Sequence, residues 1–353
     1  MHGRGDRLGA KLAERELDRM LVTDLTNVRY LTGFTGTNGA CVCGPGVRLF
    51  LTDFRYTERA ATEVEGWETV TITGDWLKGI AERLEGRTGF EDDHMSVRLL
   101  GKLKEKLAEG TEMVAAGGRV EELRRVKDEQ ELAKIAEASK LADEVSRWTL
   151  EQGLAGRRER DVARAVEARI RELGGDPSFP AIVAAGPNGA LPHAEPGERE
   201  IGRGELVVFD MGARVDGYCS DGTRTFATGE QPGEEARAVY EVVREAQQAA
   251  LDAIRAGVKG EDVDSVARKV IDDSGHGEHF GHALGHGVGL EVHEGPRLSQ
   301  RSDDVLAPGE VVTVEPGVYL PGKLGVRIED LVVVTEDGLR NLSTLPKELL
   351  VIE

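Results

Sequence analysis

Four carboxylates interrupt stretches of apolar and β-branched residues that are typical of buried strands. They are Asp210, Asp221, Glu315 and Glu329. Charged side chains are rarely buried unless they are paired or coordinate a metal ion. We expect Asp210 and Asp221 on the two arms of a β-hairpin, nearly opposite each other and within roughly 5–8 Å. Taken alone, either aspartate could instead be a structural residue at a strand end.

Histidines gather between the two pairs of carboxylates. Five of the eight histidines lie between positions 276 and 293, around the words HFGHALGHGVGLEVHEG. His282 and His286 are four residues apart, and His293 follows seven residues after His286. A single histidine in such a segment is more often a core residue than a ligand. Packing alone does not explain a histidine cluster together with four carboxylates, so the combination indicates a metal site.

Charge balance indicates what this site would hold. Four carboxylates supply four negative charges, which two divalent cations balance, and one neutral imidazole adds a fifth ligand. Oxygen ligands with a single nitrogen suit Mn²⁺, Co²⁺ or Zn²⁺, of which we expect Mn²⁺. Two such ions about 3.5–4 Å apart activate the water between them for attack on a carbonyl or phosphoryl centre. The sequence therefore predicts a two-metal hydrolase.

The first third of the chain alternates between helical and strand patterns. Helices are expected over 8–21, 75–86 and 96–110, a strand over 47–53, and an extended start to 28–36. This alternation predicts an α/β unit with a partly parallel sheet. Cys41 and Cys43 would share one face of a strand there as small buried hydrophobic residues.

The pattern changes near residue 122. A long amphipathic helical run covers 121–152, and Asp128 with Glu131 resembles a capping box. We predict an N-terminal domain over 1–122, a linker over 123–128 and a second domain over 129–353. The second domain is expected to be α+β, with helices packed on an antiparallel sheet. Its other expected helices are 159–173, 234–256 and 261–274, and its last strands lie within 309–322 and 325–338.

Bulk composition limits the partners and the compartment. The 353 residues carry a formal net charge of −19, which argues against nucleic acid or an anionic membrane surface as a partner. Three cysteines without zinc-type spacing fit a reducing cytosol. No stretch reaches ~18 apolar residues, and the N-terminal segment lacks the apolar core of a signal peptide. We therefore expect a cytoplasmic protein.

The residues around the carboxylates resemble the pita-bread metallopeptidases, and within them the proline-specific branch of prolidase and aminopeptidase P. The matching words are FDMGARVDGYCSDGTRTF, GHGVGLEVHE, VEPGVY and VRIEDLVVVT. The resemblance covers nearly the whole chain and implies a creatinase-like N-terminal domain followed by a pita-bread catalytic domain. It also implies five metal ligands, which are Asp210, Asp221, His286, Glu315 and Glu329.

The family's pattern implies a role for each of these ligands. Asp221 and Glu329 would each bridge both metal ions. Asp210 would hold one ion, while His286 and Glu315 would hold the other. Glu315 would also take a proton from the attacking water and pass it to the leaving nitrogen.

Four further residues take supporting roles by the same resemblance. His293 would stabilise the tetrahedral oxyanion, and His282 and His193 would contact the substrate as additional catalytic residues. For His193 and His282, the plain alternative is a histidine bonded to backbone carbonyls. Arg327 lies two residues before Glu329, on the same strand face, and is expected to support the ligands. Arg297 stands where some short prolidases keep an arginine that binds the carboxylate of a dipeptide.

The words LTNVRYLTGFTGTNGA and LTDFRYTERA resemble the N-terminal domain of the proline-specific enzymes and of creatinase. In that group the domain mediates dimerisation, so the resemblance implies a homodimer. The loop 31–40 would then approach the active site of the partner, unless it is an ordinary surface turn. Methionine aminopeptidases, which resemble the catalytic half, lack such a domain.

Arg297 favours an Xaa-Pro dipeptidase, which acts on proline-containing dipeptides. The alternative is an Xaa-Pro aminopeptidase that acts on longer peptides. Two remoter alternatives are a metal-free hydrolase of the creatinase type and a non-catalytic binding module with the pita-bread fold. The complete set of five ligands argues against both of these.

Overall fold

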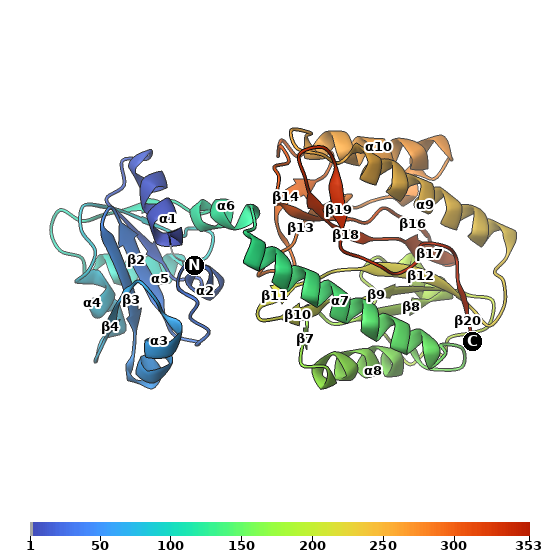
Figure 1. Ribbon diagram of the computed structural model, residues 1–353, viewed down its shortest axis with the longest axis horizontal. Coiled ribbons are helices and arrows are strands. Elements are labelled where there is room, and N and C mark those ends of the chain that lie inside the picture. Colours follow the sequence, from blue (N-terminus) through green and yellow to red (C-terminus); the bar gives the residue numbers. More distant parts are fainter. Residues whose placement is uncertain (1–2) are drawn as a thin grey trace. The chain divides into compact units, whose positions relative to one another are not determined.

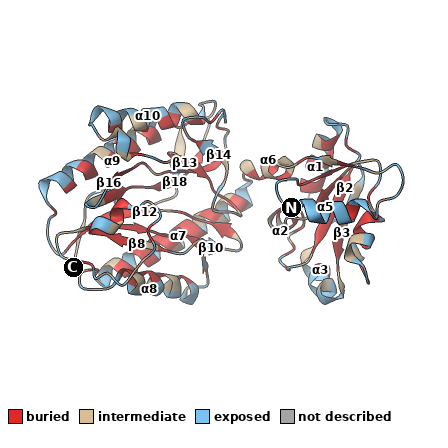
Figure 2. Cartoon of the chain, turned by 180° about the vertical axis from the view of Figure 1, so that it is seen from behind, coloured by how far each residue is buried: buried red, intermediate tan, exposed pale blue. Residues whose placement is uncertain are grey.

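The computed structural model describes residues 3–353 and shows two compact units, with the boundary between Arg124 and Arg125 (Figure 1). Each unit has its own sheets, and the buried residues follow the strands of each (Figure 2). Within the described range, no helix combines the length and the apolar character that crossing a membrane requires.

The first unit is built on a six-stranded sheet with the order β4-β3-β2-β1-β5-β6. The strands are β1 (Arg19–Val22), β2 (Ala40–Gly44), β3 (Val47–Thr52), β4 (Glu68–Thr71), β5 (Arg87–Phe90) and β6 (Glu112–Ala115). The helices are α1 (Arg4–Ala13), α2 (Leu25–Thr32), α3 (Thr57–Glu63), α4 (Trp76–Ala81), α5 (Val97–Lys104) and α6 (Arg119–Arg125). The β1–β5, β5–β6 and β3–β4 pairs are parallel, and β2 pairs antiparallel with β1 and β3. The predicted α/β unit with a partly parallel sheet is confirmed.

The helix predicted over 8–21 is only partly correct. Helix α1 ends at Ala13, and β1 begins at Arg19. The apolar residues at the end of the predicted helix, Met20 and Leu21, are fully buried in the middle of the sheet, where parallel pairing with β5 replaces helical hydrogen bonds. The helices predicted over 75–86 and 96–110 are present as the shorter α4 and α5. Cys41 and Cys43 are buried and free on β2, as expected.

The extended start predicted for 28–36 is wrong, because α2 covers this segment as far as Thr32. The carboxylate of Asp24 accepts a hydrogen bond from the Thr26 N–H and caps the start of the helix. Gly33, with a φ of 84°, adopts the left-handed conformation that ends it. These two stop and start signals outweigh the strand propensity of the residues between them.

The second unit packs two larger sheets against two pairs of helices. One sheet has the order β20-β12-β9-β8 and the other β14-β13-β15-β18-β19, with the smaller sheets β11-β10-β7 and β16-β17 beside them. The strands are β7 (Asp176–Pro177), β8 (Ile182–Ala185), β9 (Leu206–Asp210), β10 (Ala213–Val215), β11 (Tyr218–Cys219), β12 (Thr223–Thr228), β13 (Gly285–Gly287), β14 (Glu294–Leu298), β15 (Val311–Val314), β16 (Gly317–Leu320), β17 (Leu324–Arg327), β18 (Asp330–Val334), β19 (Leu339–Asn341) and β20 (Val351–Ile352).

Two hydrophobic clusters hold these layers together. Helices α7 (Glu129–Glu151) and α8 (Glu159–Glu172) pack on one side of the strands, and α9 (Glu234–Ala253) and α10 (Gly260–Asp273) pack on the other (Figure 1). Helix α7 begins with the predicted capping box, in which Asp128 and Glu131 each accept from the other's N–H. The predicted mixture of helices and largely antiparallel sheet is therefore confirmed.

The hairpin predicted to bring Asp210 and Asp221 together is more elaborate than a simple pair of arms. Strands β9 and β12 do pair antiparallel, but the residue opposite Asp210 is Thr223. Between them the chain forms the small hairpin β10–β11 in another sheet, closed by Asp216 and Gly217 with φ values of 46° and 82°. Two successive positive φ angles are typical of a tight two-residue hairpin turn. Asp221 thus reaches the end of β9 from a connecting segment rather than from a strand.

Candidate metal centre

Three carboxylates converge where β9, β12 and β18 meet. Asp210 is the last residue of β9, Asp221 lies two residues before β12, and Glu329 lies directly before β18. Oxygen atoms of the three side chains lie within 4.8 Å of one another, and the residues are 8%, 9% and 2% exposed. The Glu329 N–H donates to the Thr223 carbonyl oxygen at 3.0 Å, which aligns the start of β18 with the start of β12.

A histidine and a fourth carboxylate close the group from the neighbouring sheet. His286 lies on β13, and Glu315 directly follows β15. The Nε2 atom of His286 lies 3.3 Å from Glu315 Oε1 and 3.6 Å from Asp221 Oδ2. Its Nδ1 atom lies 3.1 Å from the carbonyl oxygen of Gly287, a contact that assigns the proton to Nδ1. Nε2 faces the carboxylates, where it can donate to Glu315 while it is protonated and, once deprotonated, would offer its lone pair to a metal ion.

The pKa directions show the cost of burying these carboxylates together. Burial, followed by the charges of Glu329 and Asp210, raises the pKa of Asp221 well above its usual range. Burial and the charge of Glu315 raise the pKa of Glu329 in the same way. Burial also raises the pKa of Glu315, but the hydrogen bond and charge of His286 outweigh it, so this pKa is lowered overall. Divalent cations in the centre would offset the repulsion that the raised values report.

The donor atoms present fit such cations. Asp210 Oδ1 and Glu329 Oε1 are buried and have no hydrogen-bond partner among residues 3–353. The second oxygen of each carboxylate is occupied, because Arg327 donates to Asp210 Oδ2 at 2.6 Å and the Thr223 hydroxyl donates to Glu329 Oε2 at 2.7 Å. Buried carboxylate oxygens are normally paired. Two orphaned oxygens inside an acidic cluster are therefore suited to metal ligation.

Arg327 connects the ligand cluster to the histidine side of the site. It is 4% exposed and, besides its bond to Asp210, donates from Nη1 to the Tyr319 hydroxyl at 2.9 Å. The same hydroxyl lies 2.9 Å from Nε2 of His282, whose Nδ1 lies 2.8 Å from the Ala283 carbonyl oxygen. Burial raises the pKa of Tyr319 to about 12, so its hydroxyl keeps its proton. Tyr319 was not predicted from the sequence, where its only signal is its place in the matching word VEPGVY.

The structure brings all ten residues singled out from the sequence to one cavity of about 620 Å³. They are the five expected ligands with Arg327, His193, His282, His293 and Arg297. The rings of His293 and His286 lie 4.3 Å apart, and burial, with the neighbouring His286, lowers the pKa of His293. Burial also lowers the pKa of His282. The remaining lining is largely apolar, and includes Phe179, Pro180, Ala181, Ile182, Pro192 and Pro196.

Two basic side chains at the start of the second unit, Arg125 and Lys127, anchor strand β14, which begins directly after His293. Lys127 Nζ donates to Glu294 Oε1 at 2.7 Å, and the two side chains are 1% and 5% exposed. Arg125 Nη1 donates to Asp304 Oδ1 at 2.6 Å, and Asp304 Oδ2 accepts from the Arg297 N–H at 2.9 Å. These interactions therefore fix the position of β14 at both of its ends.

Comparison with known proteins places this geometry among metallopeptidases. The chain matches the model of metallopeptidase family M24 over residues 133–336 and that of the creatinase/prolidase N-terminal domain over residues 4–126. An Xaa-Pro dipeptidase of Pyrococcus furiosus is 36% identical over 99% of this chain and 100% of its own length.

Two solved structures resemble the chain over almost its whole length. An Xaa-Pro dipeptidase from Bacillus anthracis is 39% identical, with 99% of both chains covered and a TM-score of 0.96. An X-Pro aminopeptidase from Thermotoga maritima is 36% identical, with 96% of this chain and 99% of its own chain covered and a TM-score of 0.89.

Proposed function

Because the chain belongs to metallopeptidase family M24 and carries a creatinase/prolidase N-terminal domain, we propose that it hydrolyses the peptide bond preceding proline in Xaa-Pro dipeptides. Family membership confirms the fold expected from the sequence, in which a pita-bread domain follows a creatinase-like domain. The observation that carries the proposal is the single cavity that joins a buried acidic centre to histidines, an arginine and an apolar wall.

We assign two divalent ions to this centre, with Mn²⁺ as the native metal. Five ligands would hold them, namely Asp210, Asp221, His286, Glu315 and Glu329. The two orphaned carboxylate oxygens and the raised pKa values of Asp221 and Glu329 support this assignment. When bound, the ions would supply an acidified water and polarise the carbonyl of the scissile bond.

The side chains around the centre would then bind the substrate and move protons. Glu315, with its lowered pKa, is ionised and can accept a proton from water before donating it to the proline nitrogen that leaves. Neutral His293, packed on His286, would donate a hydrogen bond to the oxygen on which negative charge develops. His282, oriented by the Tyr319 hydroxyl, and His193 line the same cavity and would contact the substrate there.

The preference for dipeptides rests on Arg297, a guanidinium that lines the same cavity. A dipeptide places its terminal carboxylate one residue after the scissile bond, and an arginine binds a carboxylate through two parallel hydrogen bonds. The second candidate is an Xaa-Pro aminopeptidase, which the similarity to the Thermotoga maritima aminopeptidase favours.

The decisive experiment compares two substrates on metal-depleted and reloaded protein. We expect no hydrolysis of Met-Pro after treatment with EDTA, and recovery on addition of Mn²⁺ or Co²⁺. The reloaded protein should hydrolyse Met-Pro with a higher kcat/KM than Met-Pro-Ala. Full activity of the metal-free protein would refute the metal assignment, and a preference for the tripeptide would favour the aminopeptidase.

We also propose that the protein is a cytoplasmic homodimer formed through its first unit, with the loop 31–40 near the cavity of the partner. The family resemblance of this unit supports the proposal. Light scattering at micromolar concentration should give twice the chain mass of 38.2 kDa. A monomer would remove both the dimer and the role of the loop.

A further inference from the structure

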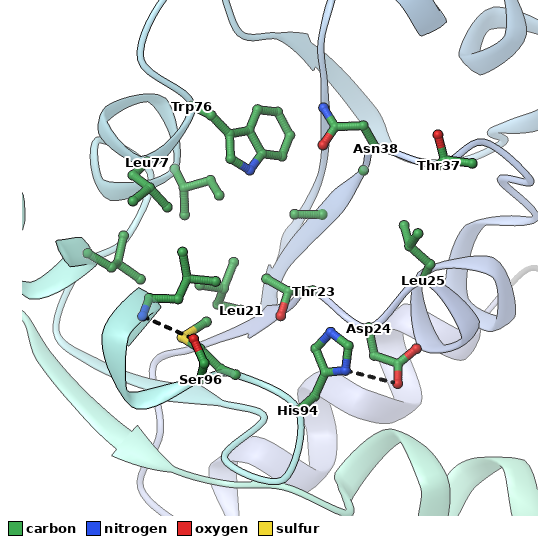
Figure 3. A pocket seen from close by; sticks show the side chains of 16 residues that line it. Leu21, Thr23, Asp24, Leu25, Thr37, Asn38, Trp76, Leu77, His94 and Ser96 are labelled. Carbon is green, nitrogen blue, oxygen red and sulfur yellow. Dashed lines mark hydrogen bonds and ion pairs between the residues drawn. The ribbon is translucent and has the colours of Figure 1, made fainter. Parts of the chain in front are cut away.

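A second cavity lies in the first unit, at the carboxyl ends of the parallel strands β1 and β5. Its volume of about 490 Å³ falls in the range of roughly 300–1,000 Å³ that is typical of small-molecule sites. Figure 3 shows Trp76 and Leu77 on one side of it, and Asp24 and His94 on another. Every lining residue belongs to the first unit, between residues 21 and 103.

The topology explains why a cavity opens at this place. After β1 the chain passes through α2 to β2 on one side, whereas after β5 it passes through α5 to β6 on the other side. The two connections therefore diverge, and a crevice is left outside the carboxyl ends of β1 and β5. Open α/β sheets bind their ligands at such switch points. Residues 23–25, which follow β1, and residues 94–96, which follow β5, both line the cavity.

The apolar lining of the cavity favours a ligand with an apolar group. Leucines, an isoleucine, a methionine and the indole of Trp76 supply most of it, and Leu25 and Leu99 remain 38% and 37% exposed as whole residues. A core would bury such residues completely, so they are available to a ligand. A compact aromatic or branched aliphatic group fits this environment.

One carboxylate sets the charge of the cavity. Asp24 is the only lining residue with a fixed charge, and its side chain is 22% exposed. Its Oδ1 accepts from the Thr26 N–H at 2.7 Å, while its Oδ2 faces His94 Nδ1 at 3.6 Å, which is longer than a hydrogen bond. Oδ2 can therefore accept a charge-assisted hydrogen bond from a cation that enters the cavity.

An anionic ligand is the competing possibility, because the N-termini of α2 and α5 both open onto the cavity and favour negative charge. Each terminus already has its own acceptor, however. Asp24 caps α2, and the Ser96 hydroxyl oxygen accepts from the Leu99 N–H at the start of α5. An anion would also meet the charge of Asp24, so the site is better suited to a cation.

We propose that this cavity is a second binding site, which takes a primary amine carried on a small aromatic or branched aliphatic body. Its lining residues belong to the first unit and the acidic centre to the second, and the proposal does not depend on the peptidase activity. Binding is expected in about the millimolar range for a minimal probe, since few atoms make contact.

The test uses the full chain labelled with 5-fluorotryptophan, because Trp76 lines the cavity and is one of three tryptophans. Fluorine NMR follows titration with 2-phenylethylamine, and a Trp76→Phe variant assigns the signal. We expect the Trp76 signal alone to shift, with the two other signals unchanged. The neutral analogue 2-phenylethanol should bind roughly fivefold more weakly, and phenylacetate more weakly still. Equal affinity for all three probes, or tighter binding of phenylacetate, would overturn the proposal.

Two variants locate the probe. Asp24→Asn removes the charge but keeps an oxygen that caps α2, so it should lower the affinity for 2-phenylethylamine roughly fivefold without changing that for 2-phenylethanol. Leu99→Lys, at a partly exposed position, places a competing cation in the cavity and should abolish binding of the amine. Unchanged signals from the other tryptophans report that each variant is folded. Parent-like binding of the amine by both variants would show that the probe binds elsewhere.

Discussion

The two cavities of this chain are built on opposite principles. The cavity of the second unit gathers five carboxylates, four histidines and two arginines, whereas that of the first unit has one carboxylate and one imidazole among mainly apolar side chains. In the second unit, desolvation and mutual repulsion of the charged groups lower the free energy of unfolding, and the rest of the fold must offset this cost. In the first unit, shape and apolar surface define the site, and its single charge remains partly hydrated.

This difference also determines how well the lining residues of each cavity can be predicted from the sequence. A charged residue inside a β-branched run is costly and therefore conspicuous. An apolar residue beside a hollow looks the same in sequence as one that fills a core. Reactive groups are thus easier to predict from a sequence than the shape of a cavity. Matched substitutions can show whether the two cavities differ in function as they do in construction.

The largest contrast is expected from the same substitution in each cavity. Asp221→Asn removes a buried carboxylate with a strongly raised pKa, which we assign to both metal ions. It should lose bound metal and lower kcat/KM for Met-Pro by roughly 10³-fold or more. Asp24→Asn, a matched change at a half-buried carboxylate of the first unit, should alter kcat/KM less than about twofold.

Metal content by elemental analysis and kcat/KM are the two measurements for this pair. If Asp221→Asn kept both metals and most of its activity, the carboxylate would not be a bridging ligand. If Asp24→Asn lost activity comparably, the two cavities would not be independent, and the comparison between them would fail.

His293→Ala should affect rate without affecting metal content. The centroids of the His293 and His286 rings lie 4.3 Å apart. Among the described residues, His293 is not part of the carboxylate cluster. Loss of a hydrogen-bond donor to the developing oxyanion typically lowers kcat by roughly 10²–10³-fold. Loss of metal in this variant would instead assign His293 to the ligand set.

The sequence predicted the residues that line the cavity of the second unit better than the residues that hold them in position. Asp210 and Glu329 were visible because each carboxylate ends or follows an apolar run. Tyr319 and Lys127 were not singled out, although Tyr319 orients His282 and Lys127 anchors β14. A tyrosine in a strand and a lysine before a helix are ordinary in sequence, and only tertiary pairing gives them a role.

Predictions in the first unit failed where short-range signals conflicted. The segment at 28–36 has strand-forming residues, yet the cap at Asp24 and the left-handed Gly33 enclose a helix. Met20 and Leu21 fall within the helix predicted over 8–21, but the sheet buries both of them completely. The cavity of the first unit could not be predicted, because it depends on which way the chain turns after β1 and β5.

Arg297→Ala should separate the two candidate substrates. If the guanidinium binds the carboxylate of a dipeptide, the lost contact is worth about 1.5–3 kcal/mol. The value of kcat/KM for Met-Pro should then fall by roughly 10–150-fold. Met-Pro-Ala has an amide at that position and should be much less affected. Equal losses on both substrates would mean that Arg297 has a structural role or makes a shared contact.

Among the variants of the second unit, the smallest effect on activity is expected at Lys127, where the contrast between the units is one of burial. Its ion pair with Glu294 has side chains that are 1% and 5% exposed, whereas Lys11 in the first unit pairs with Glu122 at 36% and 42% exposure. Removing one partner of a buried pair costs about 3–5 kcal/mol, and an exposed pair is worth about 0–1 kcal/mol. Lys127→Met should therefore lower the free energy of unfolding far more than Lys11→Met.

Lys127→Met should also lower kcat/KM roughly tenfold on both Met-Pro and Met-Pro-Ala, with metal content unchanged, because β14 begins directly after His293 and carries Arg297. Lys127→Arg restores the positive charge, and the double variant Lys127→Met with Glu294→Gln removes the unpaired carboxylate. Both should recover stability, but only Lys127→Arg should recover rate, since it alone renews the charged anchor. Equal recovery of rate by the double variant would show that the ion pair serves the stability of the second unit and does not position its catalytic side chains.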